Sequence, residues 1–136
     1  MRLTYRQQLL LALSESQNHR CAYCQLSMTL LFYVKEPGRI YSSATIEHIL
    51  PVSRGGADSD HNHVAACYLC NVLKNDFDKG LLFANLMSEL HQNAELRNKW
   101  HHLTEEEFNI VRRFIQIELF KRDKDYAFYR LNRRYH

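Results

Sequence analysis

One stretch of the chain, residues 46–74, gathers side chains that could do acid–base and metal chemistry. Glu47 is followed directly by His48, and Asn71 lies near the end of the stretch. An imidazole titrates near neutral pH, so His48 is a natural general base. Glu47 and Asn71 offer a carboxylate oxygen and an amide oxygen, which are ligands that suit Mg²⁺ or Mn²⁺. These residue types predict a base beside a hard divalent cation.

The four cysteines fall into two Cys-x-x-Cys pairs, Cys21 with Cys24 and Cys67 with Cys70. Two such pairs can supply a closed tetrahedral shell of thiolates, which is typical of a structural zinc site. Zinc held there would tie the start of the central segment to its last helix and couple folding to the metal. Buried unpaired cysteines and a redox pair are the alternatives. No thioredoxin-like βαβ pattern surrounds either pair, which disfavours the redox interpretation.

The pattern of apolar residues predicts the elements that must position these side chains. Thr4 is a candidate cap for a first helix, whose leucines at 9, 10 and 13 form a stripe that we expect to pack on the core. Around the central motifs, the pattern predicts a strand, a long loop, a second strand and a helix. The expected elements are strands at 28–34, 45–49 and 63–66, a returning segment at 39–45 and a helix at 71–77.

The last third of the chain is expected to be helical. Apolar residues at helical spacing predict one helix over Leu81–Trp100. Thr104 and Glu107 match a capping box, and a second apolar stripe follows them. We therefore expect an α+β fold in a single domain of residues 1–136. Its parts are an N-terminal helix at 1–20, a zinc-stapled core at 21–80 and a helical extension with a basic tail at 81–136.

Composition and charge narrow the class of protein. Apolar residues make up 46% of the chain, which is enough for a packed core. No segment has the length and apolarity of a membrane span, and no signal-peptide cleavage site is evident, so we expect an intracellular, cytoplasmic protein without membrane contact. The net charge is +3, and the segment from Phe108 onward carries eight Lys/Arg against three Asp/Glu. That segment is either a nucleic-acid-binding face or a solvated amphipathic helix.

Four motifs, in this order and spacing, resemble the HNH endonucleases of the ββα-metal superfold. They are Cys-Ala-Tyr-Cys at 21–24, Ile-Glu-His-Ile-Leu-Pro-Val-Ser-Arg-Gly-Gly at 46–56, Asn-His-Val-Ala-Ala-Cys at 62–67 and Cys-Asn-Val-Leu-Lys at 70–74. The resemblance covers about residues 20–77. It implies a zinc-stapled ββα-metal core and a metal-dependent DNA endonuclease that leaves a 5′ phosphate and a 3′ hydroxyl.

The resemblance also implies a role for each matching position. His48 takes the place of the general base, and Glu47 takes the place of the first ligand of the catalytic metal. Asn62 corresponds to the residue that braces the long loop and so holds the histidine. Asn71 occupies the last ligand position, where other members have His. Lys74 fits the family's lysine after Cys-Asn and is expected to contact a phosphate.

The sequence departs from the family pattern at two positions. Glu47 replaces the more usual Asp, so its carboxylate reaches one methylene further. His63 stands where an aliphatic residue is more usual. Neighbouring side chains on a regular strand point to opposite faces of the sheet. Glu47 and His48 are neighbours, yet the resemblance requires both of them at one site. We therefore expect the strand to bend or end there, close to Pro51.

The substrate expectation rests on the resemblance and on basic residues. Arg54 in the long loop is a candidate nucleic-acid contact, as are Arg130, Arg133 and Arg134 in a tail that interleaves Arg and Lys with Tyr and Phe. DNA is the expected substrate, with RNA as an alternative. Two rival functions stay open: a non-catalytic zinc-stapled nucleic-acid-binding module, and a subunit that acts with a protein partner in a larger nuclease complex. The sequence does not specify the oligomeric state.

Overall fold

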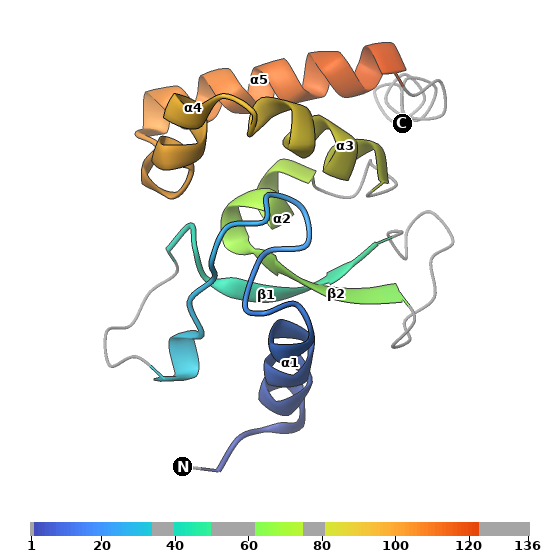
Figure 1. Ribbon diagram of the computed structural model, residues 1–136, viewed down its shortest axis with the longest axis vertical. Helices are drawn as coiled ribbons and strands as arrows, with labels where there is room; N and C mark the ends of the chain where they lie inside the picture. Colours follow the sequence, from blue (N-terminus) through green and yellow to red (C-terminus); the bar gives the residue numbers. More distant parts are fainter. Residues whose placement is uncertain (1, 34–39, 50–61, 75–80, 123–136) are drawn as a thin grey trace, which may run out of the picture.

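The structure is a computed structural model that describes residues 2–33, 40–49, 62–74 and 81–122. A two-stranded antiparallel sheet lies between helix α1 (Tyr5–Ser16) and helix α2 (Tyr68–Lys74), and the later helices lie beyond α2 (Figure 1). Helices combined with a small antiparallel sheet confirm the predicted α+β class. None of the helices in the described part of the chain combines the length and apolarity that a bilayer span requires.

The sheet consists of β1 (Ala44–His48) and β2 (His63–Cys67). Its register pairs Ala44 with Cys67 and His48 with His63. Helix α2 begins at the residue after β2, so a strand, a strand and a helix follow one another as predicted from the motifs. β1 ends at His48, which agrees with the expected end of the strand at this point.

Helix α1 begins at a capping box. The backbone N–H of Gln7 donates to the Thr4 hydroxyl, and the Thr4 N–H donates to the Gln7 side-chain oxygen. The leucine stripe packs less completely than predicted, because Ser14 is the one residue of α1 that is buried. Gln17, just after the helix, ties α1 to the sheet through hydrogen bonds to the backbone N–H and carbonyl of Ala65. Polar contacts to one strand therefore position α1, with its leucines only partly covered.

The predicted strand at 28–34 is wrong for its described part. Thr29 makes one isolated bridge to Ser43, and residues Leu31–Tyr33 form a 3₁₀ turn, η1. The Thr29 N–H donates to the carbonyl of Ser42, and the Ala44 N–H donates to the carbonyl of Thr29. In its described part, the segment before β1 therefore contacts the start of the sheet through the backbone of Thr29 and does not pair with it as a strand. The apolar and β-branched residues that suggested a strand do not distinguish these two arrangements.

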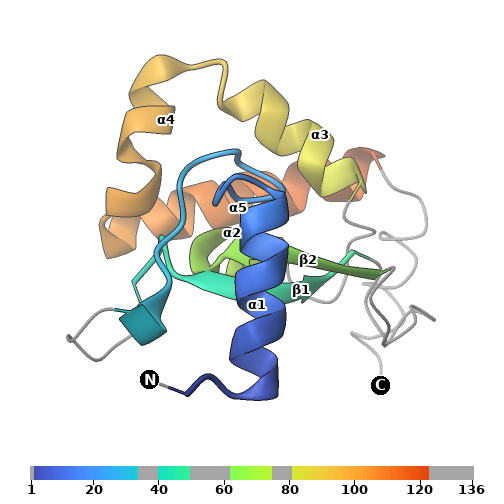
Figure 2. The ribbon, with the colours of Figure 1, turned by 60° about the horizontal axis from the view of Figure 1, so that its bottom comes forward.

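The single helix predicted over Leu81–Trp100 is divided into three elements. They are α3 (Leu81–Leu90), α4 (Ala94–Lys99) and the 3₁₀ turn η5 (Trp100–His102). The Asn93 side chain caps α4 by accepting from the Leu96 N–H, so the chain restarts as a new helix after a turn. Helix α5 (Glu105–Arg122) follows, and Figure 2 shows α3, α4 and α5 grouped on the same side of the sheet as α2.

The hydrophobic core joins these helices to the cysteine segment. Trp100 and Phe83 are fully buried. Tyr23, between the first two cysteines, packs edge-on against Phe83 with 5.3 Å between the ring centroids. Ile115 and Leu119 of α5 close the same cluster, which also contains all four cysteines. The C-terminal helices therefore cover the cysteines with apolar side chains.

Candidate functional site

The four cysteines, predicted from sequence as one metal site, lie together in the fold. The Sγ atoms of Cys21, Cys24, Cys67 and Cys70 all lie within 4.8 Å of one another, and all four residues are buried. Cys24 Sγ and Cys67 Sγ are 3.9 Å apart. A tetrahedral Zn²⁺ with Zn–S bonds of about 2.3 Å separates its sulfurs by about 3.8 Å, so the spacing fits zinc. The structure contains no disulfide among these cysteines.

Backbone amides support the thiolate form of this cluster. The N–H of Tyr23 donates to Cys21 Sγ, and the N–H of Cys70 donates to Cys67 Sγ, both at 3.4 Å. Hydrogen bonds from the neighbouring cysteines, Cys21 first, hold the pKa of Cys24 far below its usual range. Burial raises the pKa of Cys70 well above its usual range. Without a cation the buried cluster would therefore retain protons on part of its sulfurs. Zn²⁺ would replace these protons and share the charge of four thiolates.

His101 in η5 also belongs to the surroundings of the cysteines, and sequence reasoning missed it. His101 contributes to the lowered pKa of Cys24, after the larger contributions of the other three cysteines. Its Nε2 atom is buried and has no hydrogen-bond partner among the described residues. A ring N–H beside a metal-bound thiolate stabilises the negative charge on sulfur. His101 lies about eighty residues after Cys24 in the chain, so only the packing of η5 onto the core brings the two together.

Glu47, the first predicted ligand of the catalytic metal, faces α2. Its Oε1 atom lies 3.2 Å from the Nζ atom of Lys74, which also donates to the carbonyl of His48 at 3.1 Å. Lys74 has no exposed side-chain area. The structure therefore places this ammonium inside the protein, against the predicted catalytic residues. That placement does not support the predicted contact between Lys74 and a phosphate, because a buried, paired ammonium does not face a substrate.

His48, the predicted base, is the last residue of β1, and its side chain lies beside that of His63, its cross-strand neighbour. The Nε2 atoms of the two rings are 3.3 Å apart, and the ring centroids are 4.8 Å apart. Successive side chains of a strand alternate, so Glu47 contacts α2 whereas His48 contacts β2. The Glu47 side chain therefore contacts Lys74 of α2, whereas the His48 side chain contacts His63 of β2.

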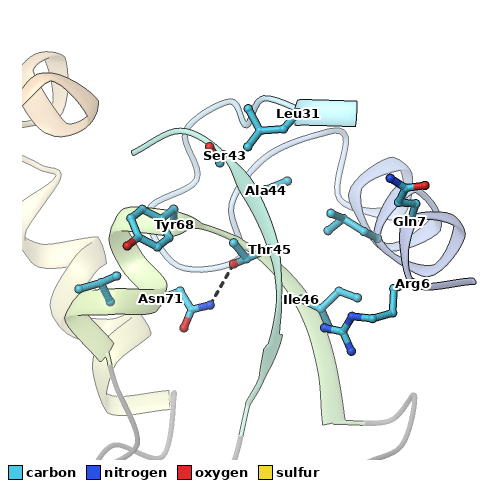
Figure 3. A pocket seen from close by; sticks show the side chains of 11 residues that line it. Arg6, Gln7, Leu31, Ser43, Ala44, Thr45, Ile46, Tyr68 and Asn71 are labelled. Carbon is cyan, nitrogen blue, oxygen red and sulfur yellow. Dashed lines mark hydrogen bonds between the residues drawn. The ribbon is translucent and has the colours of Figure 1, made fainter. Parts of the chain in front are cut away.

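Asn71, the second predicted ligand, lies on the same face of α2 as Lys74. Its Nδ2 atom donates to the Thr45 hydroxyl at 3.1 Å, and Thr45 and Glu47 lie two residues apart on β1. The facing surfaces of α2 and β1 thus bring Asn71 and Glu47 to the same side of the strand. Figure 3 shows the Asn71 amide directed at Thr45 beside the edge of β1.

A groove of about 630 Å³ follows this edge of β1 and is lined in part by Asn71. Thr45 and Tyr68 border it on the α2 side, and Arg6 and Gln7 of α1 border it on the other side (Figure 3). The groove is open and about equally polar and apolar, which suits an extended polar ligand more than a small apolar one. Among the residues that the structure describes, Arg6 is the one cation in the lining of the groove.

The segment that carries this geometry matches a known protein family. Residues 35–77 match the HNH endonuclease family. The match spans β1, β2 and α2 and confirms, over these residues, the resemblance given by the motifs. It indicates a nuclease-type function for the segment that holds Glu47, His48 and Asn71. No curated protein matches the chain significantly.

Other residues expected at the HNH site lie partly outside the described structure. The carbonyl of Asn62 accepts from the Ile49 N–H at 2.9 Å, so the backbone at Asn62 is bonded to the residue after His48. Arg54 falls in a range that the structure does not describe, and so do Arg130, Arg133 and Arg134. Their contacts with nucleic acid stay predictions.

Proposed function

We propose that the protein is a metal-dependent endonuclease that hydrolyses phosphodiester bonds in DNA. In this proposal His48 is the general base, and Glu47 and Asn71 hold a divalent metal, Mg²⁺ or Mn²⁺. The observation that carries it is the HNH match at residues 35–77, because the matched segment folds as β1, β2 and α2 with these three side chains on it. Each of the three residues belongs to the motif positions described above.

The donor chemistry of the proposed metal site fits a hard cation. Glu47 supplies a carboxylate oxygen and Asn71 an amide oxygen from facing sides of β1 and α2. A site with only a few such oxygen ligands suits Mg²⁺, because this ion keeps several waters and binds substrate phosphates directly. The Glu47 carboxylate also contacts the ammonium of Lys74 at 3.2 Å, so a divalent metal would share this carboxylate with Lys74. When bound, the metal would neutralise charge on the phosphate and on the departing oxygen.

The proposed reaction is an in-line displacement at phosphorus. His48 removes a proton from water, and the water oxygen forms a bond to phosphorus on the side opposite the 3′ oxygen. The bond from phosphorus to the 3′ oxygen then breaks, and the 3′ oxygen takes a proton from solvent water. The products are a 5′ phosphate and a 3′ hydroxyl. A neutral imidazole is suited to this proton transfer near neutral pH.

The neighbouring contacts support such a site by fixing the backbone. Lys74 joins α2 to the end of β1 through the Glu47 carboxylate and the His48 carbonyl. The backbone of Asn62 holds Ile49, the residue after the proposed base. Zinc at the four cysteines would fix the start of α2, since Cys70 immediately precedes Asn71. Positioning of this kind is what a hydrolytic site requires from its scaffold.

The test is cleavage of supercoiled plasmid by the purified full chain with Mg²⁺ or Mn²⁺. We expect nicked or linear product from the wild type and a loss of about 10²-fold or more in His48→Ala. His102→Ala is a matched control, because His102 is exposed on η5. Mapping of the product ends should give 5′ phosphates, and a parallel RNA substrate decides between DNA and RNA.

Two outcomes would reject the proposed endonuclease, and a third would reject His48 as its base. Binding of DNA without cleavage under either metal would leave the zinc-stapled binding module, which would place the protein's function in recognition. Neither binding nor cleavage by the isolated chain would point to a subunit of a larger nuclease complex. Equal cleavage by wild type and His48→Ala would show that another residue is the base.

A further inference from the structure

His48 and His63 form a cross-strand pair whose ring nitrogens face one another. The register places the two residues directly opposite on β1 and β2. Their Nε2 atoms are 3.3 Å apart, and the planes of the rings are inclined by 66°. Both residues are half-buried, so solvent and small ions reach this part of the sheet. His63 is the residue that departs from the family pattern, and neither the zinc site nor the proposed reaction uses it.

The separation of the two nitrogens equals that of two imidazole ligands on one metal ion. Metal–nitrogen bonds of about 2.0–2.1 Å at a tetrahedral angle separate two nitrogens by about 3.3 Å. The ring centroids are only 4.8 Å apart, which is too close for rings placed end to end along the line between the nitrogens. The rings are therefore inclined to the line that joins the two nitrogens. One proton or one cation can occupy the space between them.

We propose that His48 and His63 form a second transition-metal site, separate from the four cysteines, that takes Zn²⁺, Ni²⁺ or Cu²⁺. Imidazole nitrogens suit these ions, whereas Mg²⁺ prefers oxygen and does not compete for them. Two protein ligands leave the remaining positions to water, so binding here is weaker than at the cysteines. A metal on Nε2 of His48 occupies the lone pair that would accept a proton from water.

The consequence of binding rests on the proposed function. If His48 is the base, Zn²⁺ or Ni²⁺ in excess of the structural zinc inhibits cleavage that Mg²⁺ supports. The substitution of His63 by an aliphatic residue, which the family pattern favours, removes this inhibition without removing the base. His63 would then decide the sensitivity of the reaction to transition metals.

The binding test uses the full chain with its affinity tag removed and one zinc bound, titrated with Ni²⁺ in a calorimeter. We expect one Ni²⁺ per chain for the wild type and an affinity about tenfold lower or more for His63→Leu. His102→Leu is the matched control, because it removes an exposed histidine, and it should bind as the wild type does. His63→Gln serves as a second variant in case His63→Leu does not fold.

Two results would overturn the proposed metal site. One is equal Ni²⁺ affinity in the wild type and the folded His63 variants, and the other is no Ni²⁺ binding by the wild type. The cleavage assay is a separate readout, in which added Ni²⁺ should inhibit the wild type at concentrations that leave His63→Leu active. If the chain cuts no DNA, the proposed function fails, whereas the calorimetric result still decides the metal site.

Discussion

The ammonium of Lys74 is in contact with both residues of the Glu47–His48 pair. It lies 3.2 Å from the Glu47 carboxylate and 3.1 Å from the His48 carbonyl, with its side chain fully buried. A buried charge depends on its partner, because removal of one member leaves the other in a poorly solvated place. Lys74 therefore links the stability of the fold to the geometry of the proposed site.

Lys74→Met should lower the free energy of unfolding by about 3 kcal/mol. The variant retains the apolar stem but deprives Glu47 of its ammonium partner. The double variant Glu47→Leu with Lys74→Met should lose less than the sum of the single losses, because it leaves no charge behind. Urea unfolding of the four proteins, each with zinc bound, measures the coupling. Additive losses would show that the ion pair contributes no coupling energy.

His101→Phe should weaken zinc binding by about tenfold or more. His101 contributes to the lowered pKa of Cys24, and phenylalanine fills a similar volume without a hydrogen-bond donor. Competition with a zinc chelator measures the change, and His102→Phe is the control on the exposed neighbouring position. If both variants release zinc at the wild-type rate, the contact between His101 and Cys24 has no part in holding the metal.

The residues of the site differed in how far the sequence could predict them. The cysteines were predictable, because the spacing within each pair is local and their number matches a tetrahedral shell. The burial of Lys74 and the approach of His101 to Cys24 were not, since both depend on the packing of helices distant in sequence. The pairing of His48 with His63 required the register of the sheet, which the sequence between the two strands does not specify.

The elements were predictable where their ends carry local signals. Thr4 and Thr104 each begin a helix with a capping box, where the sequence predicted a cap at Thr4 and a capping box at Thr104. The break after α3 was not predicted, because the apolar spacing continues through it. His91 lies at that break, buried with its ring 4.5 Å from Trp100, so contacts with η5 favour the turn over a continuous helix. Tertiary packing outweighs helical periodicity at this point.

The cap of α5 predicts a dependence of stability on pH. Hydrogen bonds from Thr104 lower the pKa of Glu107 below its usual value of 4.5, so the folded protein prefers the ionised carboxylate. This contribution is fully present above pH 4.5 and is lost as the pH falls through the lower pKa of the folded state. Glu107→Gln retains a side-chain acceptor but does not titrate. The stability difference between wild type and Glu107→Gln should therefore shrink below pH 4.5 in urea unfolding, and a constant difference would contradict the prediction.

The groove between α1 and α2 predicts a role for Arg6 in nucleic-acid binding. Arg6 is exposed and lines the groove that reaches Asn71, outside the residues that match the HNH family. Arg6→Ala should weaken DNA binding and reduce the slope of log affinity against log salt by about 1, because one phosphate contact is lost. Arg2→Ala is the control, since Arg2 is exposed and does not line the groove. If the salt dependence of DNA binding has the same slope for Arg6→Ala and Arg2→Ala, Arg6 does not contact a phosphate in the groove.

At the scale of the whole molecule, the cysteines connect the sheet with the C-terminal helices. The core cluster contains all four cysteines together with Phe83, Trp100 and residues of α5. The sequence predicted the zinc and the helical extension separately and did not indicate that they share a core. Side-chain contacts between segments 60 or more residues apart give no local signal in the sequence. Zinc at this point would stabilise both halves of the chain at once.

Removal of zinc therefore should disrupt the C-terminal helices as well as the sheet. Trp100, the one tryptophan of the chain, is fully buried in the core cluster and so reports on that region. A strong chelator should shift its emission to longer wavelength and lower the helical circular dichroism in the same transition, because four uncompensated buried thiolates oppose packing. Readdition of Zn²⁺ should restore both signals, whereas Mg²⁺ should not, since it does not bind thiolates. A helical extension that keeps a buried Trp100 after zinc has left would show that its core forms independently of the metal.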